Sequence, residues 1–151
     1  MRIGLISDTH GLLRPEAVAA LQGCAHILHA GDIGKPEILD ALRQLAPLTV
    51  VRGNNDRAAW AEAIPHSAEL ELGGVRLFVV HEAAHLPTDL AERGVRVAIC
   101  GHSHQPLIEE RNGVLLINPG SAGPRRFKLP VSLALLQLED GHARAERVDL
   151  L

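Results

Sequence analysis

Aromatic residues are almost absent from this 151-residue chain, which has no tyrosine, one tryptophan and two phenylalanines. The core must therefore be built from leucine, isoleucine, valine and alanine. Proteins that bind single-stranded nucleic acid stack bases on aromatic rings, so this scarcity argues against such a binder. A net charge of −3 and an isoelectric point near 6.3 give no basic surface for a long polyanion either.

Cysteine and long apolar runs are also scarce. Cys24 and Cys100 form neither a CxxC pair nor a disulfide framework, which fits a reducing cytosol. No apolar run approaches the roughly 18 residues that span a bilayer, and the N-terminus lacks the pattern of a signal peptide. We therefore expect a cytoplasmic protein with no membrane partner. The length predicts a single domain over 1–151, and the sequence is compatible with a homo-oligomer.

The first half of the chain alternates short apolar runs with helical stretches. The runs lie at 2–7, 26–30 and 48–51, and the helical stretches between them begin near Pro15 and Pro36. Proline is well suited to the first turn of a helix. The alternation predicts parallel strands joined by crossover helices.

The second half has further apolar runs joined by glycine-containing turns. We expect strands near 69–72, 75–80, 95–100, 107–109, 114–117, 131–138 and 143–150. Asn112-Gly113 between two such runs is a strong signal for a hairpin. A short helix is expected over 86–93, where Gly94 would close it.

Five of the apolar runs end in side chains that can bind a metal ion. The first ends in Asp8-Thr9-His10, and side chains two positions apart on an extended segment point the same way. The ends of the other four supply Asp32, Asn54, His81, and the pair His102 and His104. In open α/β sheets, ligands bind at the carboxyl ends of the strands.

Each of these residues has an ordinary structural explanation when it is taken alone. Asp32 could cap a helix, Asn54 could lie in a turn, and His81 could be a core histidine. Five such strand ends together are better explained by a metal site. Seven nitrogen and oxygen donors without a thiolate fit divalent cations. They are too many for one tetrahedral ion and suit two ions that share a bridging carboxylate.

These motifs carry a family resemblance. In order and content, the set resembles the calcineurin-like metallophosphoesterases, through Asp8-x-His10, Gly31-Asp32, Gly53-Asn54-x-Asp56, His81 and Gly101-His102-Ser103-His104. Asn118-Pro119-Gly120-Ser121, followed by Pro124-Arg125, resembles the small bacterial and archaeal YfcE-like phosphodiesterase branch. The resemblance implies a four-layer α/β/β/α sandwich of two mixed sheets flanked by helices. It also implies a metal-dependent phosphoesterase, with phosphodiesters preferred over phosphomonoesters.

The resemblance further implies two divalent metal ions, with manganese preferred and iron, zinc, cobalt or nickel also accepted. One ion would be held by Asp8, His10, Asp32 and His104. The other would be held by Asp32, Asn54, His81 and His102, so Asp32 would bridge the two. A hydroxide that bridges the metals would attack phosphorus in line, and no side chain would be phosphorylated. Asp56 would orient a neighbouring group, as metal ligands usually require.

A small phosphoester is the expected substrate, contacted by Asn55, Ser121 and Arg125. Asn55 stands where many members of the wider family have a histidine that contacts the phosphate or protonates the leaving group. The general acid is therefore left open.

Two further histidines, His85 and His29, each have more than one explanation. The small branch commonly has His-Gly-His at the position of His81, whereas this chain has His81-Glu82. His85 is therefore either a substitute ligand, a pocket residue or a loop histidine. His29 is either a core histidine or a support for the Gly31-Asp32 turn.

The motifs also allow a second function, that of a catalytically weak or inactive scaffold with the same fold. A scaffold would be expected to have lost at least one ligand. Because every ligand position is filled, the sequence favours the enzyme.

Overall fold

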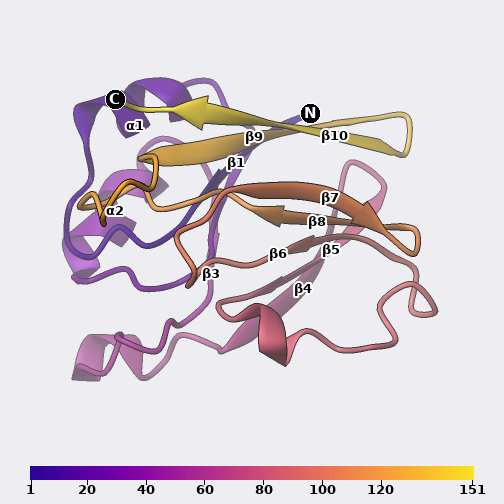
Figure 1. Ribbon diagram of the computed structural model, residues 1–151, viewed down its shortest axis with the longest axis horizontal. Helices are drawn as coiled ribbons and strands as arrows, with labels where there is room; N and C mark the ends of the chain where they lie inside the picture. The colour runs from indigo at the N-terminus through magenta and orange to yellow at the C-terminus, as the bar shows by residue number, and fades with distance from the viewer.

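Two five-stranded sheets form the body of the protein, which we describe from a computed structural model of residues 1–151 (Figure 1). The first sheet has the order β10-β9-β1-β2-β3, and the second has the order β4-β5-β6-β8-β7. The strands of the first sheet are β1 (Arg2–Ile6), β2 (His26–His29), β3 (Leu48–Val50), β9 (Ser132–Glu139) and β10 (His142–Asp149). Those of the second are β4 (Ser67–Leu72), β5 (Val75–Val80), β6 (Val95–Ile99), β7 (Leu107–Arg111) and β8 (Val114–Asn118).

Both sheets are mixed, as expected. Strands β1, β2 and β3 are parallel to one another in the first sheet, and β5, β6 and β8 are parallel in the second. The remaining strands, β4, β7, β9 and β10, pair antiparallel with their neighbours. All ten predicted strands are confirmed, and so is the hairpin that turns at Asn112-Gly113.

The main core lies between the two sheets. Ile3 and Leu5 of β1 contribute to it from one side, and Leu77 and Val79 of β5 contribute from the other. Ile6 belongs instead to a second cluster, under the helices. Strands buried on both faces read as continuous apolar runs, which explains why the sequence shows little alternation at 2–6.

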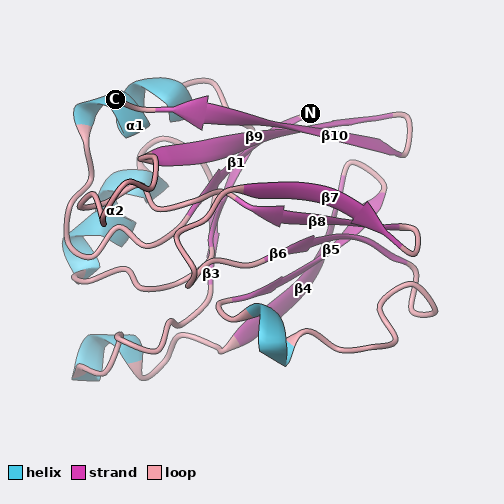
Figure 2. Ribbon diagram, in the orientation of Figure 1, coloured by secondary structure: helices cyan, strands magenta, loops and turns pink.

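Only two α-helices are present, and both begin with the predicted proline. Figure 2 also colours two short 3-10 turns as helices. The helices α1 (Pro15–Leu21) and α2 (Pro36–Arg43) cover the outer face of the first sheet through a second core cluster that includes Leu21 and Leu42. A 3-10 turn, η1 (Ala59–Ala61), follows β3. No helix is long and apolar enough to cross a membrane.

The outer face of the second sheet is covered by a loop rather than by a regular helix. This loop begins with the 3-10 turn η2 (Ala83–His85). Leu90 packs from the loop onto Phe78 and Val80 of β5. The fourth layer of the expected sandwich is therefore thin.

The predicted helix over 86–93 is wrong. Leu86 has an extended backbone, as is usual for a residue that precedes proline. The N–H of Arg93 donates to the carbonyl of Asp89 at 3.0 Å, but this single helical turn is not continued.

The parallel strands of both sheets end at one edge of the molecule. The N–H of Asp8, after β1, donates to the carbonyl of Gly31, after β2, at 3.0 Å. His81, after β5 of the second sheet, makes a 2.7 Å hydrogen bond with the carbonyl of Ala30 in the first sheet. This bond ties the two sheets together at the edge where the predicted ligands lie.

Candidate metal centre

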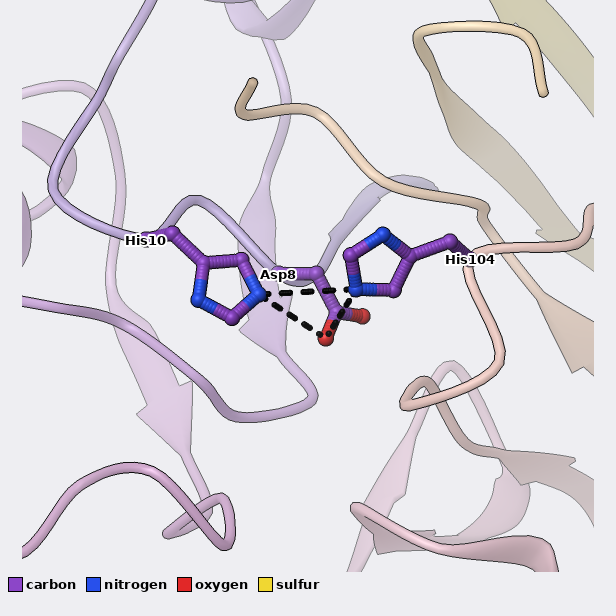
Figure 3. Close-up of side chains that lie close together, drawn as sticks. All are labelled: Asp8, His10 and His104. Atoms are coloured by element: carbon purple, nitrogen blue, oxygen red, sulfur yellow. Dashed lines mark hydrogen bonds and ion pairs between the residues drawn. The ribbon is translucent and has the colours of Figure 1, made fainter. Parts of the chain in front are cut away.

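Two groups of side chains gather at this edge, and in each group the possible ligand atoms lie within 4.8 Å of one another. The first group, which we call cluster one, consists of Asp8, His10 and His104 (Figure 3). The second group, cluster two, consists of Asp32, His81 and His102. Asn54 adjoins cluster two, because its Oδ1 lies 3.2 Å from His102 Nδ1. The structure thus brings together all seven side chains that the sequence singled out as ligands.

Cluster one joins side chains from the loops after β1 and β6. Figure 3 shows the rings of His10 and His104 turned toward each other above the Asp8 carboxylate. Their Nε2 atoms are 3.4 Å apart, and Asp8 Oδ1 lies 3.3 Å from His104 Nε2 and 3.7 Å from His10 Nε2. Asp8 Oδ1 is buried and has no hydrogen-bond partner. An unpaired buried carboxylate oxygen is costly, and a cation at this point would satisfy it.

Cluster two has the same character. His81 Nε2 lies 3.3 Å from Asp32 Oδ2 and makes no hydrogen bond. His81 Nδ1 donates to the carbonyl of Ala30, which leaves Nε2 as the free ligand atom when the ring is neutral. His102 is the exposed member of this cluster. Carboxylate, amide and imidazole donors suit a divalent transition-metal ion, so the residues fit the ions that the motifs imply.

Asp32 lies between the two clusters. Its Oδ2 is 3.3 Å from His81 Nε2 and 3.8 Å from His10 Nε2, so one oxygen reaches a member of each group. Burial works to raise the pKa of Asp32, but the nearby His81 imidazole and the hydrogen bond from the Asn55 N–H outweigh it and lower the pKa to about 2. The carboxylate is therefore ionised at neutral pH, the state in which a carboxylate can bind a metal ion.

Asn55 makes two hydrogen bonds to the Asp32 carboxylate. Its backbone N–H donates to Asp32 Oδ1 at 2.9 Å, and its side-chain amide donates to Asp32 Oδ2 at 3.0 Å. Asn55 therefore supports Asp32, and its expected contact with substrate stays a prediction.

Five of the seven donor residues have a left-handed backbone. Their φ angles lie between 46° and 71°, a region that residues other than glycine rarely occupy; they are Asp8, His10, Asp32, His102 and His104. Such strained conformations gather at functional sites, where the surrounding structure holds them in place. Nothing in the spacing of the motifs signalled this feature.

Glycines next to the donors allow the loops to approach closely. A Cβ at Gly31 would lie 2.7 Å from His81 Nδ1, and one at Gly101 would overlap the Ser7 hydroxyl. A side chain at either position would push the loops apart, which explains the Gly-Asp and Gly-His motifs.

Asp56 supports the loops but does not face the ions. It is 2% exposed, and its carboxylate accepts four backbone N–H groups at 2.9 to 3.2 Å, from Asp32, Ile33, Gly34 and Gly53. It thereby joins the loop after β2 to the loop after β3, and this link fixes the position of Asp32.

His29 is a buried support that the sequence left undecided. Its Nδ1 accepts the N–H of Gly31 at 3.0 Å, so Nε2 carries the proton and donates to Thr9 Oγ1 at 3.1 Å. The Thr9 hydroxyl donates in turn to the carbonyl of Ile33 at 2.8 Å. Burial lowers the pKa of His29 to about 4, so the ring is neutral. This chain of bonds fixes the loops that carry three of the donors.

Asn118, at the end of β8 and first in the Asn118-Pro119-Gly120-Ser121 motif, has a supporting role that the motif did not indicate. Its amide donates to the carbonyl of Gly101 at 2.9 Å and to Ser103 Oγ at 3.1 Å, and its Oδ1 accepts the N–H of Gly120 at 2.9 Å. These bonds hold the turn that carries two histidine donors. Its position before Pro119-Gly120 was the available signal.

The two remaining predicted substrate contacts differ in exposure. Ser121 is 3% exposed, and its hydroxyl donates to the carbonyl of Asp8 at 3.1 Å. The structure therefore places Ser121 beneath the loop after β1 and away from solvent. Arg125 is exposed in the loop that follows, and its contact with substrate stays a prediction.

Comparison with known families matches this arrangement. The profile of the calcineurin-like phosphoesterase superfamily domain matches residues 1–141. The chain belongs to this superfamily. The resemblance drawn from the motifs is therefore confirmed. The expectations of a metal-dependent phosphoesterase and of a fold with two packed sheets are confirmed with it.

Individual proteins resemble the chain over nearly its whole length. A probable metallophosphoesterase of Methanothermobacter thermautotrophicus is 39% identical, over 97% of this chain and 91% of the relative. An archaeal phosphodiesterase of known structure superposes with a TM-score of 0.81 at 24% identity, covering 98% of this chain and all of its own. Vps29 of Chaetomium thermophilum superposes with a TM-score of 0.80 at 20% identity, covering 98% of this chain and 95% of its own. The two solved structures share the fold.

Proposed function

We propose that this calcineurin-like protein hydrolyses phosphodiesters with the help of two divalent cations. The observation that carries the proposal is the position of Asp32, whose Oδ2 faces one histidine of each cluster. In cluster one, Asp8, His10 and His104 would hold one ion, and in cluster two Asn54, His81 and His102 would hold the other. When bound, the two cations would activate a water molecule and neutralise the charge of the phosphate.

The protein's own groups would position the reactants. Asn55 holds the Asp32 carboxylate through two hydrogen bonds, so the bridging ligand cannot rotate away. His102 has an exposed ring, so a substrate can reach cluster two from solvent. An asparagine amide has no proton to give at neutral pH, so Asn55 cannot serve as a general acid. We therefore expect faster turnover of esters whose leaving group needs no proton.

Manganese is the ion that we propose. The donor set of carboxylate, amide and imidazole groups accepts manganese, iron, cobalt, nickel or zinc, because it contains no thiolate to favour the softer ions. Metal analysis of the purified protein, followed by addition of each ion to metal-free protein, would rank them.

The test is a hydrolysis screen of the Mn²⁺-loaded protein. Bis(p-nitrophenyl) phosphate and p-nitrophenyl phosphate share a leaving group and compare a diester with a monoester. Asp32→Ala should abolish hydrolysis and lower the bound metal together. Asp40→Ala is the matched control, since Asp40 is exposed on α2, where its carboxylate pairs with Arg43 of the same helix. Full activity of Asp32→Ala would overturn the proposal.

A binding scaffold is the second candidate function, because the chain shares its fold with Vps29. The complete set of donors supports the enzyme instead, since a scaffold has no need to retain every ligand. A protein that binds metal at both clusters but hydrolyses neither ester would favour the scaffold. Cleavage of p-nitrophenyl phosphate alone would favour a phosphomonoesterase.

A further inference from the structure

A cavity of about 530 Å³ adjoins cluster two. Asn54 and His81, both candidate metal ligands, form part of its wall. A phosphate bound at the clusters would therefore direct one of its ester groups toward this space. The volume falls within the range of sites that hold small organic ligands, which is about 300–1,000 Å³.

One wall of the cavity is apolar and rigid. It includes Phe78 and Val80, which are buried residues of β5, and Pro87 from the covering loop. The Arg93 guanidinium lies over the Phe78 ring, 5.6 Å from its centroid, and Arg93 pairs with Glu69, so the ring is held in place. A flat apolar group could lie against this wall without rearrangement of the sheet.

The rim of the cavity carries histidines that the metal centre does not use. His66 and His85 are both exposed and both line the cavity. His85 Nε2 lies 3.5 Å from the carboxylate of Glu82, and the other oxygen of that carboxylate lies 3.8 Å from His102 Nδ1. Glu82 therefore lies between His85 and His102 of cluster two.

Arg52 adds a planar cation to the same rim. Its Nε donates to the carbonyl of Asp56 at 2.8 Å, and its backbone N–H donates to the carbonyl of Pro65 at 2.8 Å. These bonds anchor the side chain beside the cavity. Imidazole and guanidinium planes both stack on flat rings and donate hydrogen bonds to ring nitrogens and oxygens.

We propose that this cavity binds the organic group of the phosphoester, and that this group is a planar aromatic ring, either an aryl group or a nucleobase. The proposal rests on the proposed function, because the phosphate is placed at the clusters. The ring would lie between the apolar wall and the planes of His66 and His85. Histidine and arginine would thus supply the stacking surface in a chain that has almost no aromatic residues.

Equilibrium binding of phosphonates to the Mn²⁺-loaded protein tests this proposal without turnover. Methylphosphonate probes the clusters alone, phenylphosphonate adds an aryl group, and the phosphonate analogue of adenosine monophosphate adds a nucleoside. Calorimetry should show that phenylphosphonate or the nucleoside analogue binds about tenfold more tightly than methylphosphonate, the gain expected for one stacked ring. The arm that shows the gain identifies the source of the ring.

The double variant His66→Ala/His85→Ala should lose this gain and bind methylphosphonate as the parent protein does. His142→Ala is the matched control, an exposed histidine on β10. Equal binding of all three ligands by the parent protein, or an undiminished gain in the double variant, would overturn the cavity proposal alone. Failure of methylphosphonate to bind would instead refute the placement of phosphate at the metal centre.

Discussion

His10 Nε2 lies 3.4 Å from His104 Nε2, although 94 positions separate the two residues in the chain. Burial lowers the pKa of His10, and the positive charge of a protonated His104 would lower it further, although Asp32 and Asp8 oppose the shift. Two neutral rings that both direct a lone pair into this gap would repel each other. A cation between them removes the repulsion, which is the physical reason to expect metal at cluster one.

Single histidine substitutions should separate the two ions. In His104→Ala, cluster one loses a ligand, so the bound metal should fall from about two ions to about one per chain, as for sites that need several donors. His102→Ala should do the same at cluster two. Metal analysis after dialysis measures the ratio, with His142→Ala as the control. Two tightly bound ions in His104→Ala would contradict the ligand assignment.

Replacement of Asp56 by asparagine should destabilise the fold. The amide nitrogen would face N–H groups that now donate to a carboxylate oxygen, so at least one buried N–H would lose its acceptor. We expect the free energy of unfolding to fall by about 3 kcal/mol, and the affinity for metal to fall with it. Urea denaturation of metal-free protein measures the first effect. Asp40→Asn, on the exposed face of α2, should leave the stability unchanged.

Asn118→Ala should loosen the turn that presents His102 and His104. The substitution removes three hydrogen bonds, two of which end on Gly101 and Ser103. Loss of such support around a metal site typically lowers affinity about 10–100-fold. Competition with a fluorescent chelator would measure it. Unchanged affinity for both ions would show that the turn holds its shape without Asn118.

The stability of the metal-free protein should depend on pH through His29. Burial lowers the pKa of this ring from 6.5 to about 4, so between these values the unfolded chain binds a proton that the folded chain does not. The free energy of unfolding therefore rises as the pH increases from about 4 to 6.5 and falls as the pH decreases through the same range. The slope is at most about 1.4 kcal/mol per pH unit.

Urea titrations of metal-free protein between pH 4 and 7 would measure this slope. His29→Asn cannot take up the proton, so its slope should be smaller than that of the parent protein. His142→Asn, which replaces an exposed histidine, should keep the parent slope. Identical slopes for the parent protein and His29→Asn would show that His29 is not the buried titrating group.

Much of the fold could be predicted because its signals are local. Most strands are apolar runs or alternating segments that lie near glycine or proline, and both helices begin with proline. The helix expected over 86–93 failed because Leu86 takes an extended conformation before Pro87. The pattern of polar and apolar residues did not show that the segment after Pro87 forms turns rather than a helix.

The sequence by itself determined which residues stand at the strand ends, because the order of apolar runs, turns and donor side chains is a property of neighbouring positions. Only the tertiary structure decided what these residues do there. It placed Asp32 between the two clusters and Asn55 within hydrogen-bond distance of the Asp32 carboxylate. It also buried Ser121 beneath the loop after β1. Such roles depend on distances between segments far apart in the chain, and packing of the two sheets sets those distances.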